Sequence, residues 1–107
     1  MPQNSVASRP AAPPASYINR ISASLERAKR YPNVARIRRL QGVGVLEFSM
    51  QRNGQVTGWR IVRSSGHAEL DEAIGEMIQR ASPLPPPPEE VAGNPVVLTV
   101  PVSFALR

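Results

Sequence analysis

The sequence of 107 residues contains no cysteine and a single histidine, His67. Without cysteine the chain has no disulfide, no thiol nucleophile and no cysteine-based zinc site. With one histidine, a histidine-dependent metal site would need carboxylates for most of its ligands. Aromatic residues make up only 5% of the chain, against 41% hydrophobic residues. We therefore expect a core built mainly from aliphatic side chains.

Long hydrophobic runs are also missing. No apolar stretch approaches the ~20 residues that a membrane-spanning helix needs, and no signal peptide is recognisable. Residues 1–16 are instead rich in proline, alanine and serine, a composition that stays extended and cannot build a core. We expect residues 1–16 to be the remnant of a flexible tether and residues 17–107 to form one domain with a thin core.

The charge is unevenly distributed along the chain. The net charge is +5, and the segment from Arg20 to Arg39 holds one acid, Glu26, among seven cations: Arg20, Arg27, Lys29, Arg30, Arg36, Arg38 and Arg39. One end of the molecule should therefore carry a positive field that attracts an acidic partner. Nucleic acid, anionic lipid and an acidic protein segment all remain candidates on charge alone.

The N-terminal half of the domain begins with two helical patterns. Apolar residues at helical spacing predict a helix from Tyr17 to about Arg30, with Ser16 as its N-cap. Pro32 ends that pattern and can open a second short helix, through about Arg38, that carries Val34 and Ile37.

The remaining patterns alternate between strands and one helix. They predict strands over Gly42–Met50 and Gln55–Arg63 joined by a hairpin turn at Asn53-Gly54, a helix from His67 to about Ala81, a proline-rich loop over Ser82–Pro95, and a last strand over Val96–Leu106. The order α-α-β-β-α-β predicts an α+β fold. We expect a three-stranded antiparallel sheet with the first strand in the centre and two helices packed on one face.

Pro101 in the last strand identifies an edge. Its ring removes a backbone donor, which a central strand tolerates badly. Because alternate residues direct their backbone groups to the same side of a strand, Val97, Thr99, Ser103 and Ala105 are predicted to face the free edge together with Pro101. Such an edge is protected from indiscriminate pairing but suits a partner that adds as a further strand.

The order of short motifs resembles one protein family, the C-terminal domains of TonB-type energy transducers. The matching elements are Tyr31-Pro32, Ala35-Arg36, Gln41-Gly42, the strand containing Phe48 with Asn53-Gly54, Ser64-Ser65-Gly66, Leu70-Asp71, the proline-rich loop and Val100-Pro101-Val102-Ser103-Phe104. The resemblance runs from about Tyr17 to Leu106. One departure is Val34, where many members of the family carry a polar or basic residue that helps to bind their partner, an outer-membrane transporter.

The resemblance implies a partner and a location. The partner would be a TonB-dependent outer-membrane transporter for siderophores, haem or cobalamin, whose box segment adds as a strand. Contacts are expected along the last strand (Val97, Thr99, Pro101, Ser103, Ala105) and near the short helix (Ala28, Arg30, Tyr31, Pro32, Arg36). The domain would be periplasmic, with an N-terminal helix outside this sequence anchoring the protein in the inner membrane beside a proton-driven motor of the ExbB-ExbD type.

Other readings of the sequence are weaker. The acids of the predicted third helix are ordinary dipole partners, His67 suits a capping or surface role, and Ser64-Ser65-Gly66 is a turn with no base spaced to activate a serine. We therefore expect no enzyme, no metal and no cofactor. A small nucleic-acid-binding module is the alternative by charge, although the sequence offers only Trp59 as a sheet aromatic for base stacking, beside a compact group of arginines. A weak homodimer through the exposed edge is left open.

Overall fold

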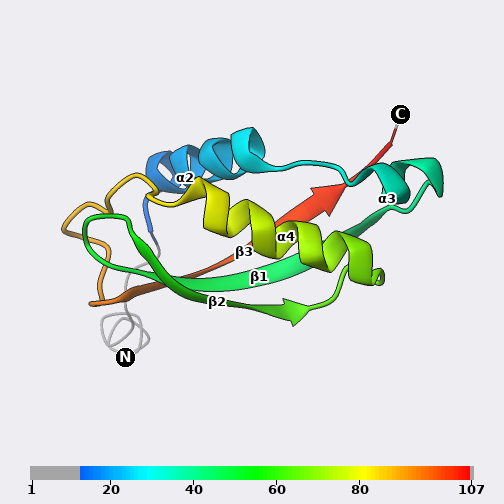
Figure 1. Cartoon of the computed structure of the whole chain (residues 1–107). Coiled ribbons are helices and arrows are strands. Elements are labelled where there is room, and N and C mark those ends of the chain that lie inside the picture. Colours follow the sequence, from blue (N-terminus) through cyan, green and yellow to red (C-terminus); the bar gives the residue numbers. More distant parts are fainter. Residues whose placement is uncertain (1–12, 107) are drawn as a thin grey trace, which may run out of the picture.

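The computed structural model describes residues 13–106, and these form an α+β fold (Figure 1). The predicted order of elements is confirmed: α2 (Ala15–Ala28), α3 (Asn33–Ile37), β1 (Gly42–Met50), β2 (Val56–Arg63), α4 (Ala68–Ala81) and β3 (Val96–Phe104). The predicted tether over residues 1–16 falls mostly on residues 1–12, which lie outside the described residues. Helix α2 begins within the remainder, two residues before the predicted start at Tyr17.

The sheet has three antiparallel strands in the order β2-β1-β3, so β1 is central, as predicted. Strands β1 and β3 pair without interruption from Gly42↔Phe104 to Met50↔Val96. The β1–β2 ladder is less regular, with register shifts between Val45 and Leu46 and between Ser49 and Met50. Among residues 13–106, β3 therefore has a neighbouring strand on one side only.

The β1–β2 turn differs from the expected two-residue Asn-Gly turn. Gln51 N donates to Gln55 O at 2.8 Å, which encloses a loop of three residues. Only Gly54 in this loop has a positive φ, of 94°, while Asn53 accepts a hydrogen bond from Gln55 N on its Oδ1 at 3.0 Å. A three-residue hairpin needs one left-handed residue after the turn, so glycine takes that place and asparagine does not need to.

Helices α2 and α4 cover the same face of the sheet (Figure 1). Each buries one stripe at helical spacing, and the even-numbered residues of β3 meet them from the sheet. The fully buried larger side chains are Tyr17, Ile21, Leu46, Phe48, Met50, Leu70, Ile74, Met77, Ile78, Val96 and Phe104. Burial of each contributes about 1.5–3 kcal/mol. Trp59 lies at the margin, 38% exposed, with its ring against Gly75 of α4.

Both predicted starts of the N-terminal helices need correction. Ser16 is not the N-cap of α2: Pro14 holds that position, and its carbonyl accepts the first bonds, from Tyr17 N at 3.0 Å and Ile18 N at 3.1 Å. Pro32 precedes α3 as its N-cap and is not its first helical residue. A proline has no N–H to satisfy, so it is tolerated both as the N-cap and as the first residue of a helix.

The loop between α4 and β3 is irregular, as its prolines predict, and polar side chains fix it to the domain. The Arg52 guanidinium donates to three loop carbonyls, those of Val91 at 2.5 Å, Gly93 at 3.0 Å and Pro88 at 3.1 Å. Tyr17 donates its hydroxyl to Pro85 O at 2.8 Å, and burial raises the pKa of that phenol. The loop therefore enters β3 along a fixed path.

Candidate functional site

The free edge of β3 is the most distinctive surface of the described residues. Val97, Thr99, Pro101 and Ser103 are exposed, alternating with buried neighbours along the whole strand. Ala105 is also exposed but follows the end of β3 at Phe104, so the strand is two residues shorter than predicted. Past that end, Leu106 N donates to Gln41 Oε1 at 2.8 Å.

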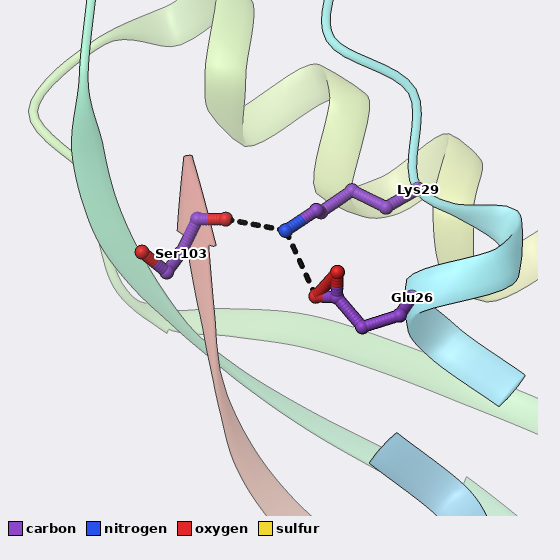
Figure 2. Close-up of polar contacts among 3 residues, drawn as sticks. All are labelled: Glu26, Lys29 and Ser103. Carbon is purple, nitrogen blue, oxygen red and sulfur yellow. Dashed lines mark hydrogen bonds and ion pairs between the residues drawn. The ribbon is translucent and has the colours of Figure 1, made fainter. Parts of the chain in front are cut away.

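One hydrogen bond reveals which backbone groups face this edge. The Ser103 carbonyl accepts a bond from Lys29 Nζ at 2.7 Å, and Lys29 is not part of the sheet. Figure 2 shows this carbonyl directed away from β1 and toward the lysine. Because backbone directions alternate along a strand, Val97, Thr99 and Pro101 direct their groups to the same open side. At Pro101 the missing N–H therefore breaks no bond of the ladder with β1.

Lys29 is the C-cap of α2, directly after Ala28, and its backbone is extended. Its ammonium also pairs with Glu26 at 2.9 Å (Figure 2) and lies 5.5 Å from the centre of the Phe104 ring. The lysine side chain is 21% exposed and that of Glu26 66%. Sequence reasoning did not single out Lys29: the only signal was its place in the cationic run.

Two of the predicted contact residues stand beside the end of β3. The rings of Tyr31 and Phe104 meet edge to face with centres 5.3 Å apart. The Arg36 guanidinium lies 6.0 Å from the centre of the Tyr31 ring, and the Tyr31 hydroxyl donates to the Leu40 carbonyl. The structure thus brings Tyr31 and Arg36 to Phe104, the last residue of β3, although they are distant in sequence.

The other three predicted residues of this region differ in what they expose. Ala28 is buried in the core, and its carbonyl accepts two hydrogen bonds from Arg80, so it offers little surface to a partner. Arg30 is exposed and Pro32 is half-buried. Of the five residues predicted near α2 and α3, Arg30, Tyr31, Pro32 and Arg36 therefore reach the surface and Ala28 does not.

Helix α3 does not bury the apolar residues that its pattern suggested. Val34 is 50% and Ile37 is 81% exposed, while Ala35 alone enters the core. The helix has only five residues, so a single small side chain suffices to attach it. Arg38 pairs with Glu69 at 2.6 Å across to α4. The seven cations from Arg20 to Arg39, the basic cluster, are thus partly neutralised within the domain. Near α3 the surface combines arginines with exposed aliphatic groups.

The acids of α4 serve the local structure. Asp71 accepts hydrogen bonds from Ser64 Oγ at 2.6 Å, Ser65 Oγ at 2.6 Å and Ser65 N at 2.8 Å. Burial by itself raises the pKa of Asp71, but these bonds and the charge of His67 outweigh it and hold the pKa below its usual range. His67 is the N-cap of α4, without a side-chain capping bond.

Neither a metal-ligand group nor a membrane span occurs in the described part of the chain. Residues 13–106 contain no set of three acidic or histidine side chains that could hold a metal ion. Within the same residues, every helix is too short or too polar to cross a bilayer. The backbone edge of β3, with its neighbours Lys29, Tyr31 and Arg36, remains the candidate functional site.

Comparison with known proteins gives a consistent result. Residues 27–106 match the family model described as Gram-negative bacterial TonB protein C-terminal. The chain is 40% identical to the TonB protein of Pasteurella multocida over 91 residues, which cover 85% of this chain and 34% of that protein. It is 42% identical to the TonB protein of Pseudomonas putida over 76 residues, covering 71% of this chain and 31% of that protein. The chain therefore spans about a third of the length of these relatives.

Solved structures agree in fold. The solution structure of the Helicobacter pylori TonB C-terminal domain superimposes with a TM-score of 0.77 at 27% identity, covering 100% of this chain and 95% of that one. The structure of the HasB C-terminal domain gives a TM-score of 0.58 at 43% identity, covering 85% of this chain and 70% of that one. The three-stranded sheet with its helices is thus shared with both.

Proposed function

Because this chain belongs to the family of Gram-negative bacterial TonB C-terminal domains, we propose that it binds a short extended segment of an outer-membrane transporter along the free edge of β3. Proteins of this family are energy transducers and binding proteins, not enzymes. The function therefore has to be sought in a surface that holds a partner.

The observation that carries the proposal is the outward direction of the Ser103 carbonyl beside Pro101. It places the backbone groups of Val97, Thr99 and Pro101 on the open side of β3, where an added strand can pair with them. In strand addition the main-chain bonds give affinity and the adjoining side chains give specificity. The defect at Pro101 limits unselective pairing, because one donor of the edge is missing.

A second contact surface adjoins the end of this edge. Arg30 and Arg36 are exposed there, and Tyr31 links them to β3 through Phe104. We assign Arg30 and Arg36 to contacts with acidic groups of the transporter beyond its box segment, and Tyr31 and Pro32 to the surface between these arginines and β3. Rim charges of this kind steer association more than they add affinity.

The remainder of the proposal concerns the whole protein, of which this chain corresponds to about a third in its relatives. The domain works in the periplasm and belongs to a protein anchored in the inner membrane. A motor of the ExbB-ExbD type supplies energy from the proton gradient, and the domain delivers it to transporters for siderophores, haem or cobalamin.

Nucleic-acid binding is less well supported. Its modules stack bases on exposed aromatic side chains of a sheet, whereas Trp59, the single tryptophan, packs its ring on α4. Two cations of the basic cluster, Lys29 and Arg38, pair with Glu26 and Glu69 within the domain.

An amide-resolved NMR titration tests the proposal. The titrant is a peptide spanning the N-terminal box of a TonB-dependent transporter from the same organism. We expect shifts concentrated on residues 96–106 and 28–39. A scrambled peptide of equal charge is the control. Unmoved β3 amides with the box peptide, together with a response of the cluster to single-stranded RNA, would favour the nucleic-acid alternative.

A further inference from the structure

We infer that Lys29 sets the register of the incoming strand, because it closes the C-terminal end of the β3 edge so that pairing ends at Pro101. The inference rests on the proposed function, since it concerns the strand that β3 would bind. On this inference Lys29, a residue outside the sheet, determines which part of the β3 edge a partner can pair with.

The first step is the position of the ammonium. In an added strand, the backbone nitrogen facing Ser103 would lie ~2.9 Å from its carbonyl oxygen. Lys29 Nζ already donates to that oxygen from the open side at 2.7 Å (Figure 2). The backbone of an added strand would lie ~4.8 Å from β3, and the lysine side chain crosses that space. The lysine thus acts as the donor that a partner would otherwise supply.

The second step is how firmly the ammonium is held. It pairs with Glu26 at 2.9 Å and lies over the Phe104 ring at 5.5 Å. Its backbone leaves α2 directly after Ala28, whose carbonyl is fixed by Arg80 at 2.7 and 3.0 Å. Displacing Lys29 would break these contacts as well as the bond to Ser103. We therefore expect the lysine to remain in place while a partner binds.

The consequence is a short usable edge with a defined partner chemistry. Val97, Thr99 and Pro101 present carbonyls on the open side that no other group of residues 13–106 bonds, and only the first two also present an N–H. A matching segment needs backbone N–H groups at three alternating positions. Its residue facing Ser103 needs none, so proline or an N-methylated residue is tolerated there. At the opposite end Pro95 precedes the strand and likewise offers no donor.

An N-methyl scan of the transporter box peptide tests this register. Each variant peptide carries one methylated backbone nitrogen, and its affinity is measured by calorimetry. For the wild-type domain we expect three alternating positions at which methylation weakens binding about tenfold. At the position that faces Ser103, two residues beyond one end of this series, the change should stay below about twofold. Lys29→Met frees the Ser103 carbonyl, so a fourth sensitive position should appear two residues beyond one end of the series. That end also reports the direction of the added strand.

The matched control is Arg27→Met, which removes a neighbouring exposed cation that bonds only to Ser24 in the described residues and should leave three sensitive positions. Four sensitive positions with the wild-type domain, or the same pattern with Lys29→Met, would overturn the inference while strand addition stands. The wild-type scan decides alone if the variant does not fold. No binding of any box peptide would instead refute the proposed function and the inference with it.

Discussion

The guanidinium of Arg80 in α4 donates two hydrogen bonds to the backbone carbonyl of Ala28, from Nε at 3.0 Å and Nη2 at 2.7 Å. Ala28 is the last residue of α2, where helix carbonyls lack intrahelical partners. One side chain of α4 thus caps the neighbouring helix at the point where the chain turns toward Lys29.

Removing this cap should destabilise the domain. For Arg80→Met we expect a decrease of about 1–2 kcal/mol in the free energy of unfolding, because a charge-assisted pair of bonds is lost and the carbonyl becomes partly unsatisfied. Urea unfolding followed by circular dichroism measures it. Arg63→Met on the exposed side of β2 is the control, and equal losses from both substitutions would show that the Ala28 contact contributes nothing.

The core prediction concerns Ile74, which is completely buried in α4. Ile74→Ala should cost about 2–5 kcal/mol, because the lost methyl groups leave a cavity among packed neighbours. Ile37→Ala removes the same groups from a side chain that is 81% exposed and should change stability by less than about 0.5 kcal/mol. Similar values for the two substitutions, again by urea unfolding, would contradict the packing of α4 on the sheet.

Asp71 predicts a specific loss of stability in acid. Its folded pKa is lowered, so its stabilising contribution is complete above the unfolded pKa of ~3.9 and disappears as the pH falls through the folded value. Asp71→Asn should therefore lower stability at pH 7 and flatten the decline that begins as the pH falls below about 5. Glu72→Gln, an exposed neighbour, should keep the wild-type profile. A wild-type slope in Asp71→Asn would exclude this carboxylate as its origin.

Pro101 predicts an effect on association. Pro101→Val supplies the missing N–H on the open side of β3, so positions 97, 99 and 101 all present a donor and an acceptor to another copy of the chain. We expect sedimentation velocity to show a larger dimer fraction than for the wild type at equal concentration. Pro86→Val, an exposed loop position, is the control. If Pro101→Val stays as monomeric as the wild type, the missing donor is not what restrains self-pairing.

Much of the fold could be predicted because it depends on local periodicity. The two-residue alternation of β3 and the helical stripe of α4 each identify a buried face without knowledge of the partner element. Gly42–Met50 was predicted to the residue for the same reason. Sequence also located the edge, since proline is rarely found in a central strand.

What sequence could not predict depends on contacts between distant segments. Lys29 and Ser103 are 74 positions apart, and nothing in the local pattern distinguishes Lys29 from the other cations of its segment. The exposure of Ile37 follows from how α3 meets the rest of the domain. The hairpin turn was predicted at the right place, but with a loop of two residues in place of three. The loop length is fixed by the hydrogen bond between Gln51 and Gln55, and residue type alone does not determine it.

The uninterrupted β1–β3 register has a mechanical consequence. It joins the two strands from Gly42↔Phe104 to Met50↔Val96, whereas a partner restricted by Lys29 reaches only Val97, Thr99 and Pro101. A load along the strand axis shears both the β1–β3 pairing and the pairing of β3 with its partner. The pairing with the partner is shorter, so fewer hydrogen bonds share the load. We expect the partner to detach before the sheet opens. The domain would then stay folded under a high load, and its edge could bind a partner again.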